Sequence, residues 1–288
     1  MPHPDRRTAL AIGAAAALAA LAACAPAGAG PPGGGASLAP TPTPTPTGRP
    51  RPQGAAAPIP VDVPEPAPPA QPPPELVRVP APEGTIDSLP GEGALLAWTI
   101  DDGANAEVIA AYAAFASATG VRLTMFVTGS YSAWDENVDV LAPLIASGQV
   151  QLGNHTWSHP DLTSLDDAGV AEELRRNHDF ITETFGVDAR PFYRPPFGYH
   201  DDRVDAIAAE LGYRVPTLWY GSLSDSGEVP ATLIVDLAHQ WFLPQHIVIG
   251  HLNWMPVTTV FDELRGIIAE RGLTTVTLND VFSSEYHP

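Results

Sequence analysis

The sequence predicts an α/β domain with a mainly parallel sheet, either doubly wound or closed into a small barrel. Two observations support this fold class. From about residue 84, short apolar runs typical of strands alternate with longer segments of helical periodicity. Most of the 33 prolines fall before residue 90, so the later part of the chain has the composition of an ordinary globular domain.

Six strands and six helices are expected in alternation, and repeated strand–helix units favour parallel strands in one sheet. The expected strands are short apolar runs at residues 94–100, 122–128, 150–156, 213–219, 246–252 and 273–278. The expected helices cover residues 105–118, 138–147, 168–185, 202–211, 230–242 and 258–271. The helix at 168–185 shows its periodicity most clearly, because one face carries Val170, Leu174, His178, Ile181 and Phe185. Gly186 follows as its predicted C-cap.

The N-terminus has the pattern of a secretory signal. Arg6 and Arg7 precede an apolar run from Ala9 to Ala23, which is shorter than the roughly 20 residues of a transmembrane helix. The run ends in Leu-Ala-Ala before Cys24 and resembles a bacterial lipobox. We therefore predict a lipoprotein signal peptide at residues 1–23 and a lipid anchor on Cys24, which would hold an exported protein on a membrane, facing the cell wall or periplasm. A plain signal peptide is the alternative.

Residues 24–83 are predicted to form a disordered Pro/Ala/Thr-rich linker that precedes a folded domain at residues 84–288. The linker contains the repeat Thr-Pro-Thr-Pro-Thr-Pro-Thr at residues 41–47 and has too few large apolar side chains to bury a core. Proline-rich chains favour extended conformations of about 3.1 Å per residue, so this segment would act as a spacer.

The formal net charge of −19 argues against nucleic acid as a partner, since phosphate backbones require basic patches. An acidic surface suits a neutral or cationic glycan, or simply keeps an exported protein soluble. Cys24 is the only cysteine, so no intramolecular disulfide can form. The composition leaves the oligomeric state open.

Acidic and histidine side chains follow two of the expected strands. The first strand ends in Asp101-Asp102-Gly103, and adjacent buried carboxylates are costly unless something pairs with them. A metal on one carboxylate and a proton-transfer role for the other would explain both. The third strand ends with His155 and His159, which are four residues apart and can reach one cation. Together with an aspartate they would form a two-histidine, one-carboxylate set with open positions.

Two later segments carry further candidates. Arg194 precedes Pro-Pro-Phe-Gly and is a fixed positive charge that could hold Asp101 in place. The backbone N–H of Phe197 could face an oxyanion, although the segment also reads as a rigid connecting loop. His251 ends an apolar strand and is a candidate general acid or a structural histidine.

In this order, these segments resemble the motifs of the polysaccharide deacetylase family, also called the NodB homology domain or carbohydrate esterase family 4. The resemblance spans about residues 92–282, and the matching motifs are 99–103, 155–159, 194–198 and 249–251. The fourth family motif falls on 219–226 and is altered. Ser222 stands where the family has Asp, Asp225 matches, and Ser226 stands where the family has Trp. Trp219 or Trp254 could supply the missing wall of the acetyl pocket.

The resemblance implies a distorted (β/α) barrel of about seven strand–helix units and a metal-dependent deacetylase. It implies one divalent ion, zinc first and cobalt or another divalent ion next, bound by Asp102, His155 and His159. It also implies roles in proton transfer and charge stabilisation: Asp101 as base, His251 as acid, Arg194 orienting Asp101 with Asp225 behind Arg194, and the Phe197 N–H at the oxyanion.

The implied substrate is an N-acetylglucosamine-type polysaccharide. Export and a wall-spanning tether favour peptidoglycan over chitin or xylan. An O-acetyl esterase acting on polysaccharide is one alternative, and a non-catalytic glycan-binding lipoprotein, which the altered fourth motif would permit, is another.

Overall fold

The computed structural model describes residues 76–283. The predicted signal peptide, Cys24 and almost all of the predicted linker lie outside the described residues. Within the described part, no helix is long and apolar enough to cross a membrane.

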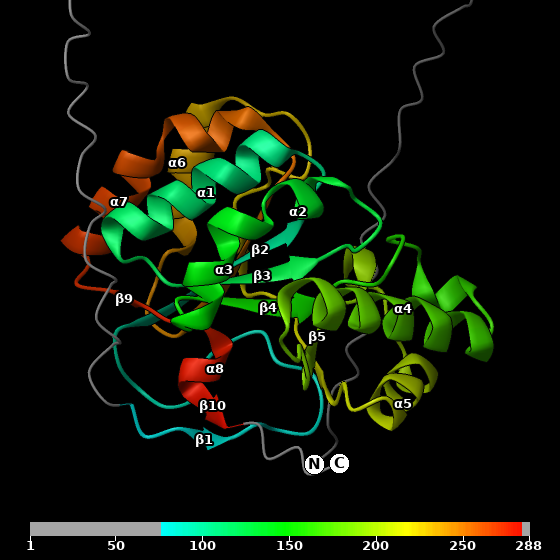
Figure 1. The fold of residues 1–288 in the computed structure, drawn as a ribbon. Coiled ribbons are helices and arrows are strands. Elements are labelled where there is room, and N and C mark those ends of the chain that lie inside the picture. Colours follow the sequence, from blue (N-terminus) through cyan, green and yellow to red (C-terminus); the bar gives the residue numbers. More distant parts are fainter. Residues whose placement is uncertain (1–75, 284–288) are drawn as a thin grey trace, which may run out of the picture. The chain divides into compact units, whose positions relative to one another are not determined.

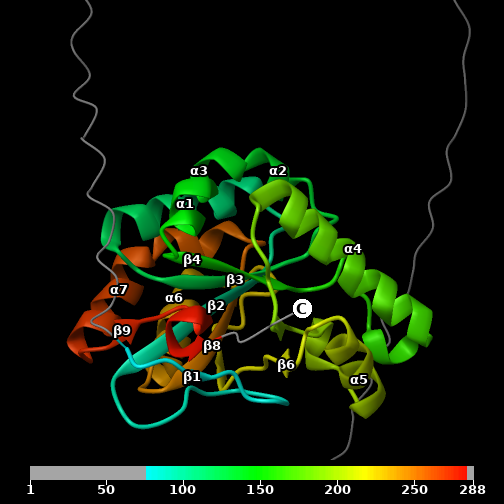
Figure 2. The same cartoon turned by 60° about the horizontal axis from the view of Figure 1, so that its bottom comes forward.

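The centre of the domain is a sheet of eight parallel strands that curls into a half-barrel (Figures 1 and 2). Its strand order is β6-β5-β4-β3-β2-β8-β7, and β9 also pairs with β2. The strands are β2 (Leu95–Asp102), β3 (Leu123–Val127), β4 (Val150–Asn154), β5 (Phe192–Tyr193), β6 (Val215–Pro216), β7 (Gly221–Ser222), β8 (His246–His251) and β9 (Thr274–Thr275). The α/β prediction with a curled parallel sheet is confirmed.

Helices pack around this sheet in two groups (Figure 1). The first group lies over one face and contains α1 (Ala106–Thr119), α2 (Ala133–Glu136), α3 (Val138–Ala146), α6 (Ala231–Trp241) and α7 (Phe261–Glu270). The second group, α4 (Asp167–Phe185) and α5 (Asp202–Glu210), lies toward β5. Short 3₁₀ turns occur at Leu162–Ser164, Pro196–Gly198 and Met255–Thr259, and a last short helix, α8, covers Leu278–Val281.

Capping residues define the ends of two of the longer helices, and the predicted C-cap at Gly186 is confirmed. Asn105 caps α1 by accepting hydrogen bonds from the backbone N–H groups of residues 107 and 108. Asp166 caps α4, and Gly186 ends it in the left-handed conformation with φ 70°, which glycine adopts without a steric penalty.

Alternation along β2 directs its side chains to opposite faces of the sheet. Leu96, Trp98 and Ile100 enter the large core between the sheet and the helices. Ala97 enters a smaller core on the concave face, together with Phe126 and Ile247. By the same alternation Asp101 faces the concave side, so the end of a hydrophobic strand places a carboxylate inside the half-barrel.

The folded domain begins earlier than the predicted boundary at residue 84. The strand β1 (Val79–Pro80) pairs in parallel with β10 (Phe282–Ser283), so these two residues belong to the domain and not to the linker. The predicted strand 213–219 is also shorter than expected. Its ladder with β5 covers Val215–Pro216, and the next residue, Thr217, forms an isolated bridge with Ile86.

Candidate active site

The carboxyl ends of the central strands meet at one edge of the half-barrel. Asp101 lies opposite His251 in the β2–β8 ladder, and Asp102 lies opposite Val127 in the β2–β3 ladder. His155 follows directly after β4. A cavity of about 440 Å³ opens here, lined by Asp101, Asp102, His155, His159, Pro195, Phe197, Trp219, Ser222, Ser226, Ile249 and His251.

Three of the predicted side chains form a candidate metal centre. Oδ1 of Asp102 lies 3.4 Å from Nε2 of His155 and 3.3 Å from Nε2 of His159. One ligand atom from each residue lies within 4.8 Å of the others. Within residues 76–283, the buried Oδ1 of Asp102 has no hydrogen-bond donor. An orphaned carboxylate oxygen beside two imidazole nitrogens is a donor set that fits a divalent ion such as zinc.

Neighbouring groups orient these three ligands. Nδ1 of His155 lies 2.7 Å from the carbonyl oxygen of Arg194. A proton on Nδ1 donates to that carbonyl, so the lone pair of Nε2 faces Asp102. On the other side, Asn253 donates from Nδ2 to Oδ2 of Asp102 at 2.6 Å, which leaves Oδ1 directed at the histidines. No motif in the sequence marks Asn253, which stands two residues after His251 and is brought to Asp102 only by the β2–β8 pairing.

The backbone around the centre adopts conformations that are rare for side-chain-bearing residues. Asp102, Thr156, His159 and Phe197 have φ values of 76°, 71°, 59° and 60°. Such strain gathers at functional sites, where the surrounding structure holds it in place. Gly103 has φ 97°, and an ideal Cβ there would lie 2.3 Å from the Trp134 ring, so this position requires glycine.

Arg194 holds Asp101, as the sequence analysis expected. Its Nη1 donates to Oδ1 of Asp101 at 2.5 Å, and both side chains are buried. The rest of the guanidinium is also anchored, because Nε donates to the carbonyl of Thr217 at 2.7 Å and Nη2 to that of Leu218 at 3.1 Å. Oδ2 of Asp101 remains 3.5 Å from Nε2 of His155 and faces the metal centre.

Asp225 occupies a different place from the one expected. The prediction set it behind Arg194, but its Oδ1 lies 3.0 Å from Nδ1 of His251. The reason is topological, since β7 pairs with β8 and the loop after β7 therefore passes the end of β8, where His251 stands. Asp225 is thus the partner of His251, the candidate acid, and not of Arg194.

Charge and burial shift the pKa values in this cavity in different directions. Burial by itself raises the pKa of Asp102, but the neighbouring imidazole of His155 outweighs burial and holds that pKa far below its usual value. Burial lowers the pKa of His159. Burial also acts to lower the pKa of His251, but the Asp225 hydrogen bond and the charge of Asp101 raise it overall. The raised pKa extends the pH range over which His251 carries a proton.

Exposed aromatic side chains border the cavity. The Phe197 side chain is 58% exposed, and its ring lies 4.7 Å from that of His159. Trp219 lines the cavity wall, as one of two alternatives proposed from the sequence. Trp254 is not among the lining residues; its Nε1 donates to the carbonyl of Ser226 at 3.1 Å.

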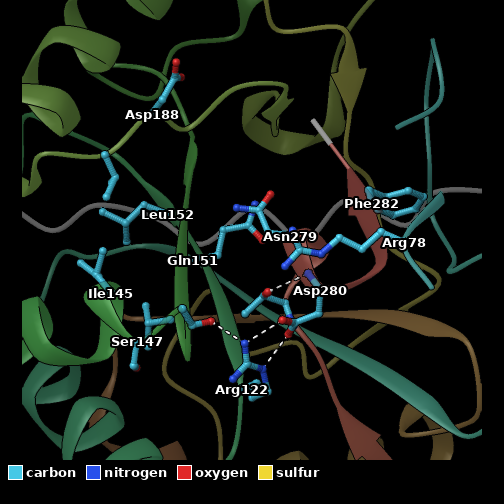
Figure 3. Close-up of a pocket in the computed structure, with 14 residues that line it drawn as sticks. Arg78, Arg122, Ile145, Ser147, Gln151, Leu152, Asp188, Asn279, Asp280 and Phe282 are labelled. Carbon is cyan, nitrogen blue, oxygen red and sulfur yellow. Dashed lines mark hydrogen bonds and ion pairs between the residues drawn. The ribbon is translucent and has the colours of Figure 1, made fainter. Parts of the chain in front are cut away.

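A second cavity of about 380 Å³ lies near the start of β4 (Figure 3). Its polar groups are largely bonded to one another. Arg122 donates from Nε and Nη2 to Asp280 at 2.6 and 2.7 Å and to the carbonyl of Gly148 at 2.7 Å. Oε1 of Gln151 accepts from the N–H of Asn279 at 2.7 Å. These hydrogen bonds join α8 to the segments where β3 and β4 begin, so we assign this cavity a structural role.

The fold and the site define a class of protein: a parallel α/β half-barrel whose strand ends carry a possible metal site between acid–base candidates. Residues 89–216 match the family model "Polysaccharide deacetylase". This match assigns residues 89–216 to a polysaccharide deacetylase domain.

Several solved structures share this fold. The Bc1960 peptidoglycan N-acetylglucosamine deacetylase is 22% identical with a TM-score of 0.63, covering 70% of this chain and 95% of that one. The chitin deacetylase of Colletotrichum lindemuthianum is 22% identical with a TM-score of 0.63, covering 72% and 99%. A family 4 pseudoenzyme from Bacillus anthracis is 18% identical with a TM-score of 0.61, covering 71% and 70%.

Among curated proteins, chitin deacetylase 1 of Cryptococcus neoformans is 40% identical over 99 residues, which is 34% of this chain and 20% of that protein. A chitin deacetylase from Pestalotiopsis is 30% identical over 135 residues, which is 46% of this chain and 44% of that protein. The chain therefore spans less than half the length of these relatives.

Proposed function

We propose that the protein is a metal-dependent hydrolase that removes N-acetyl groups from N-acetylglucosamine-type sugars of a cell-envelope polysaccharide, with peptidoglycan as the first candidate. One observation carries this proposal. The Asp102–His155–His159 group lies in the same cavity as Asp101 and His251. Behind the cavity wall, Arg194 pairs with Asp101 and Asp225 pairs with His251. One pair offers a carboxylate that can accept a proton and the other an imidazole that can donate one, which are the two groups that amide hydrolysis needs.

A divalent ion held by Asp102, His155 and His159 would polarise the acetyl carbonyl and make water more acidic. Oδ2 of Asp101 takes a proton from the water as the water oxygen forms a bond to the acetyl carbon. Arg194 keeps Oδ1 of Asp101 engaged, so the second oxygen stays directed at the reacting water. His251 gives a proton to the sugar nitrogen as the C–N bond breaks, and acetate and the free amine leave.

Two further groups have positioning roles in this proposal. Asp225 holds the His251 ring through Nδ1, which leaves Nε2 to carry the transferred proton. The N–H of Phe197, in a strained turn on the cavity wall, stabilises the negative oxygen that develops on the acetyl carbon.

The cellular setting of the proposal rests on the N-terminal sequence. Arg6 and Arg7, the apolar run that follows them and the lipobox-like residues before Cys24 support export and a lipid anchor. A Pro-rich spacer behind that anchor would let the domain reach into a cell wall. A solved relative is named as a peptidoglycan N-acetylglucosamine deacetylase, which supports the same substrate class here.

Two alternatives keep the fold and change the activity. Cleavage of O-acetyl esters on a polysaccharide is the first, and a bifunctional xylanase/xylan deacetylase of Cellvibrio japonicus is 28% identical over 175 residues. Glycan binding without catalysis is the second. Ser222 and Ser226 on the cavity wall favour it, as does a structural relative that is a pseudoenzyme.

The test is acetate release from N-acetylglucosamine oligomers by the chain from residue 25 onward, first with EDTA and then with added zinc or cobalt. Acetate that disappears with EDTA and returns with metal supports the N-deacetylase. Activity on O-acetylated xylan alone, retained in His251→Ala, would select the esterase, because an alcohol leaving group needs less protonation than an amine. A chain that binds metal but releases no acetate from either substrate would favour the alternative of glycan binding without catalysis.

A further inference from the structure

Behind the His251–Asp225 pair lies a group of buried polar atoms that bond to nothing else within residues 76–283. They are Oδ2 of Asp225, Nε1 of Trp98 and the hydroxyl of Tyr112. Each belongs to a side chain that is at most 2% exposed. Buried polar atoms without partners are rare because each has lost its hydrogen bonds to water. Three in one place therefore require an explanation.

Two of these atoms, on Asp225 and Trp98, lie beside the same point, the Tyr112 side chain packs against Trp98, and the three groups are chemically complementary. An ideal Cβ on Gly250 would lie 3.4 Å from Oδ2 of Asp225 and 3.5 Å from Nε1 of Trp98. The Tyr112 ring packs edge-on against the Trp98 ring, with centroids 5.7 Å apart. Burial first, and then the charge of Asp225, raise the pKa of the Tyr112 hydroxyl well above its usual value, so that hydroxyl keeps its proton. The group thus holds two donors and one charged acceptor.

Gly250 provides the space between these atoms. It lies on β8 opposite Ile100 of β2, on the same face as Trp98. Because residue 250 has no side chain, the region that a Cβ would enter lies between the carboxylate and the indole N–H. A buried water needs two to four polar partners. This region offers two, Oδ2 of Asp225 and Nε1 of Trp98, and the Tyr112 side chain packs beside Trp98.

We propose that Trp98 and Tyr112 act as positioning residues for the Asp225–His251 pair, through one buried water molecule beside Gly250. The water accepts hydrogen bonds from the Trp98 N–H and the Tyr112 O–H and donates one to Oδ2 of Asp225. This arrangement satisfies all three orphaned atoms at once. The role in catalysis rests on the proposed function, whereas the water site itself does not.

The consequence for His251 follows from the charge on Asp225. Hydrogen bonds to Oδ2 spread the carboxylate charge and weaken its pull on the imidazolium. The charged groups that face His251 are Asp225 from the loop after β7, and Asp101 and Asp102 from β2. Loss of one donor concentrates the Asp225 charge on His251, so the ring should hold its proton to higher pH and become a weaker acid.

Tyr112→Phe is the sharpest test, because it removes one hydroxyl and leaves the ring. His251 titration is followed by NMR of the imidazole nitrogens, and the thermal midpoint is measured on the same samples. We expect the His251 midpoint to move to higher pH by about half a unit, the thermal midpoint to fall, and kcat to fall about three-fold or more with KM unchanged. Trp98→Phe should move the His251 midpoint in the same direction.

The matched control is Tyr213→Phe. The Tyr213 hydroxyl also lies in the interior, but its partner is Nδ1 of His178 at 2.9 Å. Its loss should lower the thermal midpoint and leave the His251 titration in place.

An unchanged or lowered His251 midpoint in Tyr112→Phe would overturn the proposal. A raised thermal midpoint would also overturn it, because removal of a truly unsatisfied hydroxyl relieves a desolvation cost. The NMR titration needs no turnover, so a chain that proves inactive on acetylated sugars would refute the proposed function and still leave this network open to the same measurement.

Discussion

Asp101→Asn separates the proposed base from the proposed metal site. The asparagine keeps the shape of the side chain and an oxygen that can accept from Nη1 of Arg194, 2.5 Å away in the native pair. It cannot take a proton from water. Asp102, His155 and His159 keep their own contacts, so we expect the variant to bind metal as the native chain does.

The magnitudes follow from the chemistry and the burial. General-base catalysis contributes about 10²–10⁴-fold, so kcat should fall by that factor. Arg194 is fully buried and would lose its charged partner. Removal of one member of a buried ion pair lowers the free energy of unfolding by about 3–5 kcal/mol. Because the asparagine oxygen still accepts from Arg194, we expect a loss near the lower figure, about 3 kcal/mol. For a domain of this size that corresponds to a fall of about 6–12 °C in thermal midpoint.

The assay combines acetate release, metal content by mass spectrometry and thermal unfolding on one preparation. Asp236→Asn is the matched control, because Asp236 is exposed on α6 and should leave all three unchanged. A variant that binds metal, remains folded at the assay temperature and still releases acetate at the native rate would remove Asp101 as the base. A variant that loses its metal would show that Asp101 belongs to the metal site.

Three further predictions concern the neighbours of this pair. His155→Ala removes a ligand, so bound metal and activity should both be lost, and an unchanged metal content would refute the ligand assignment. Asp225→Asn removes a carboxylate that raises the pKa of His251, so the alkaline limit of kcat should move to lower pH. The carboxylate also stabilises the native chain at low pH, and this stabilisation is lost as pH rises through the His251 pKa. The variant should lack that pH-dependent stabilisation. Gly103→Ala forces a Cβ onto the ring of Trp134 and should cost about 2–4 kcal/mol by thermal unfolding, whereas a cost under about 0.5 kcal/mol would mean that the ring moves freely.

The long elements of the fold could be predicted because their signals are local. The predicted helix 168–185 differs from α4 by one residue, since one amphipathic face and two caps lie within the segment itself. The strands β5 and β7 were missed because each pairs over only two residues. Such short strands are defined by their neighbours in the sheet, and two residues contain no periodicity that a sequence could reveal.

In the site, too, the features with local sequence signals could be predicted and most of the long-range contacts could not. The predicted metal ligands do gather in one cavity with Asp101, Phe197 and His251, because parallel strands bring their carboxyl ends to one edge. Apart from the pairing of Arg194 with Asp101, the contacts that orient these residues could not be predicted from the sequence. Asn253 and Asp102 are 151 positions apart. The pairing of Asp225 with His251 depends on β7 lying beside β8, which the sequence analysis did not foresee.

The altered segment 219–226 separates the chemistry from the fit of the substrate. Asp225 keeps its contact with His251, while Ser222 and Ser226 stand on the cavity wall. A wall residue that touches the acyl group equally before and during reaction changes KM and leaves kcat alone. Ser226→Trp should therefore narrow the cavity and change KM for acetylated oligomers several-fold, with kcat within about two-fold of the native value. Parallel kinetics on N-acetyl and N-propionyl oligomers measure this, and the larger acyl group should be rejected more strongly by the variant. A rise in kcat of a hundred-fold or more would contradict the argument, because it would show that the serine at 226 limits the reaction itself.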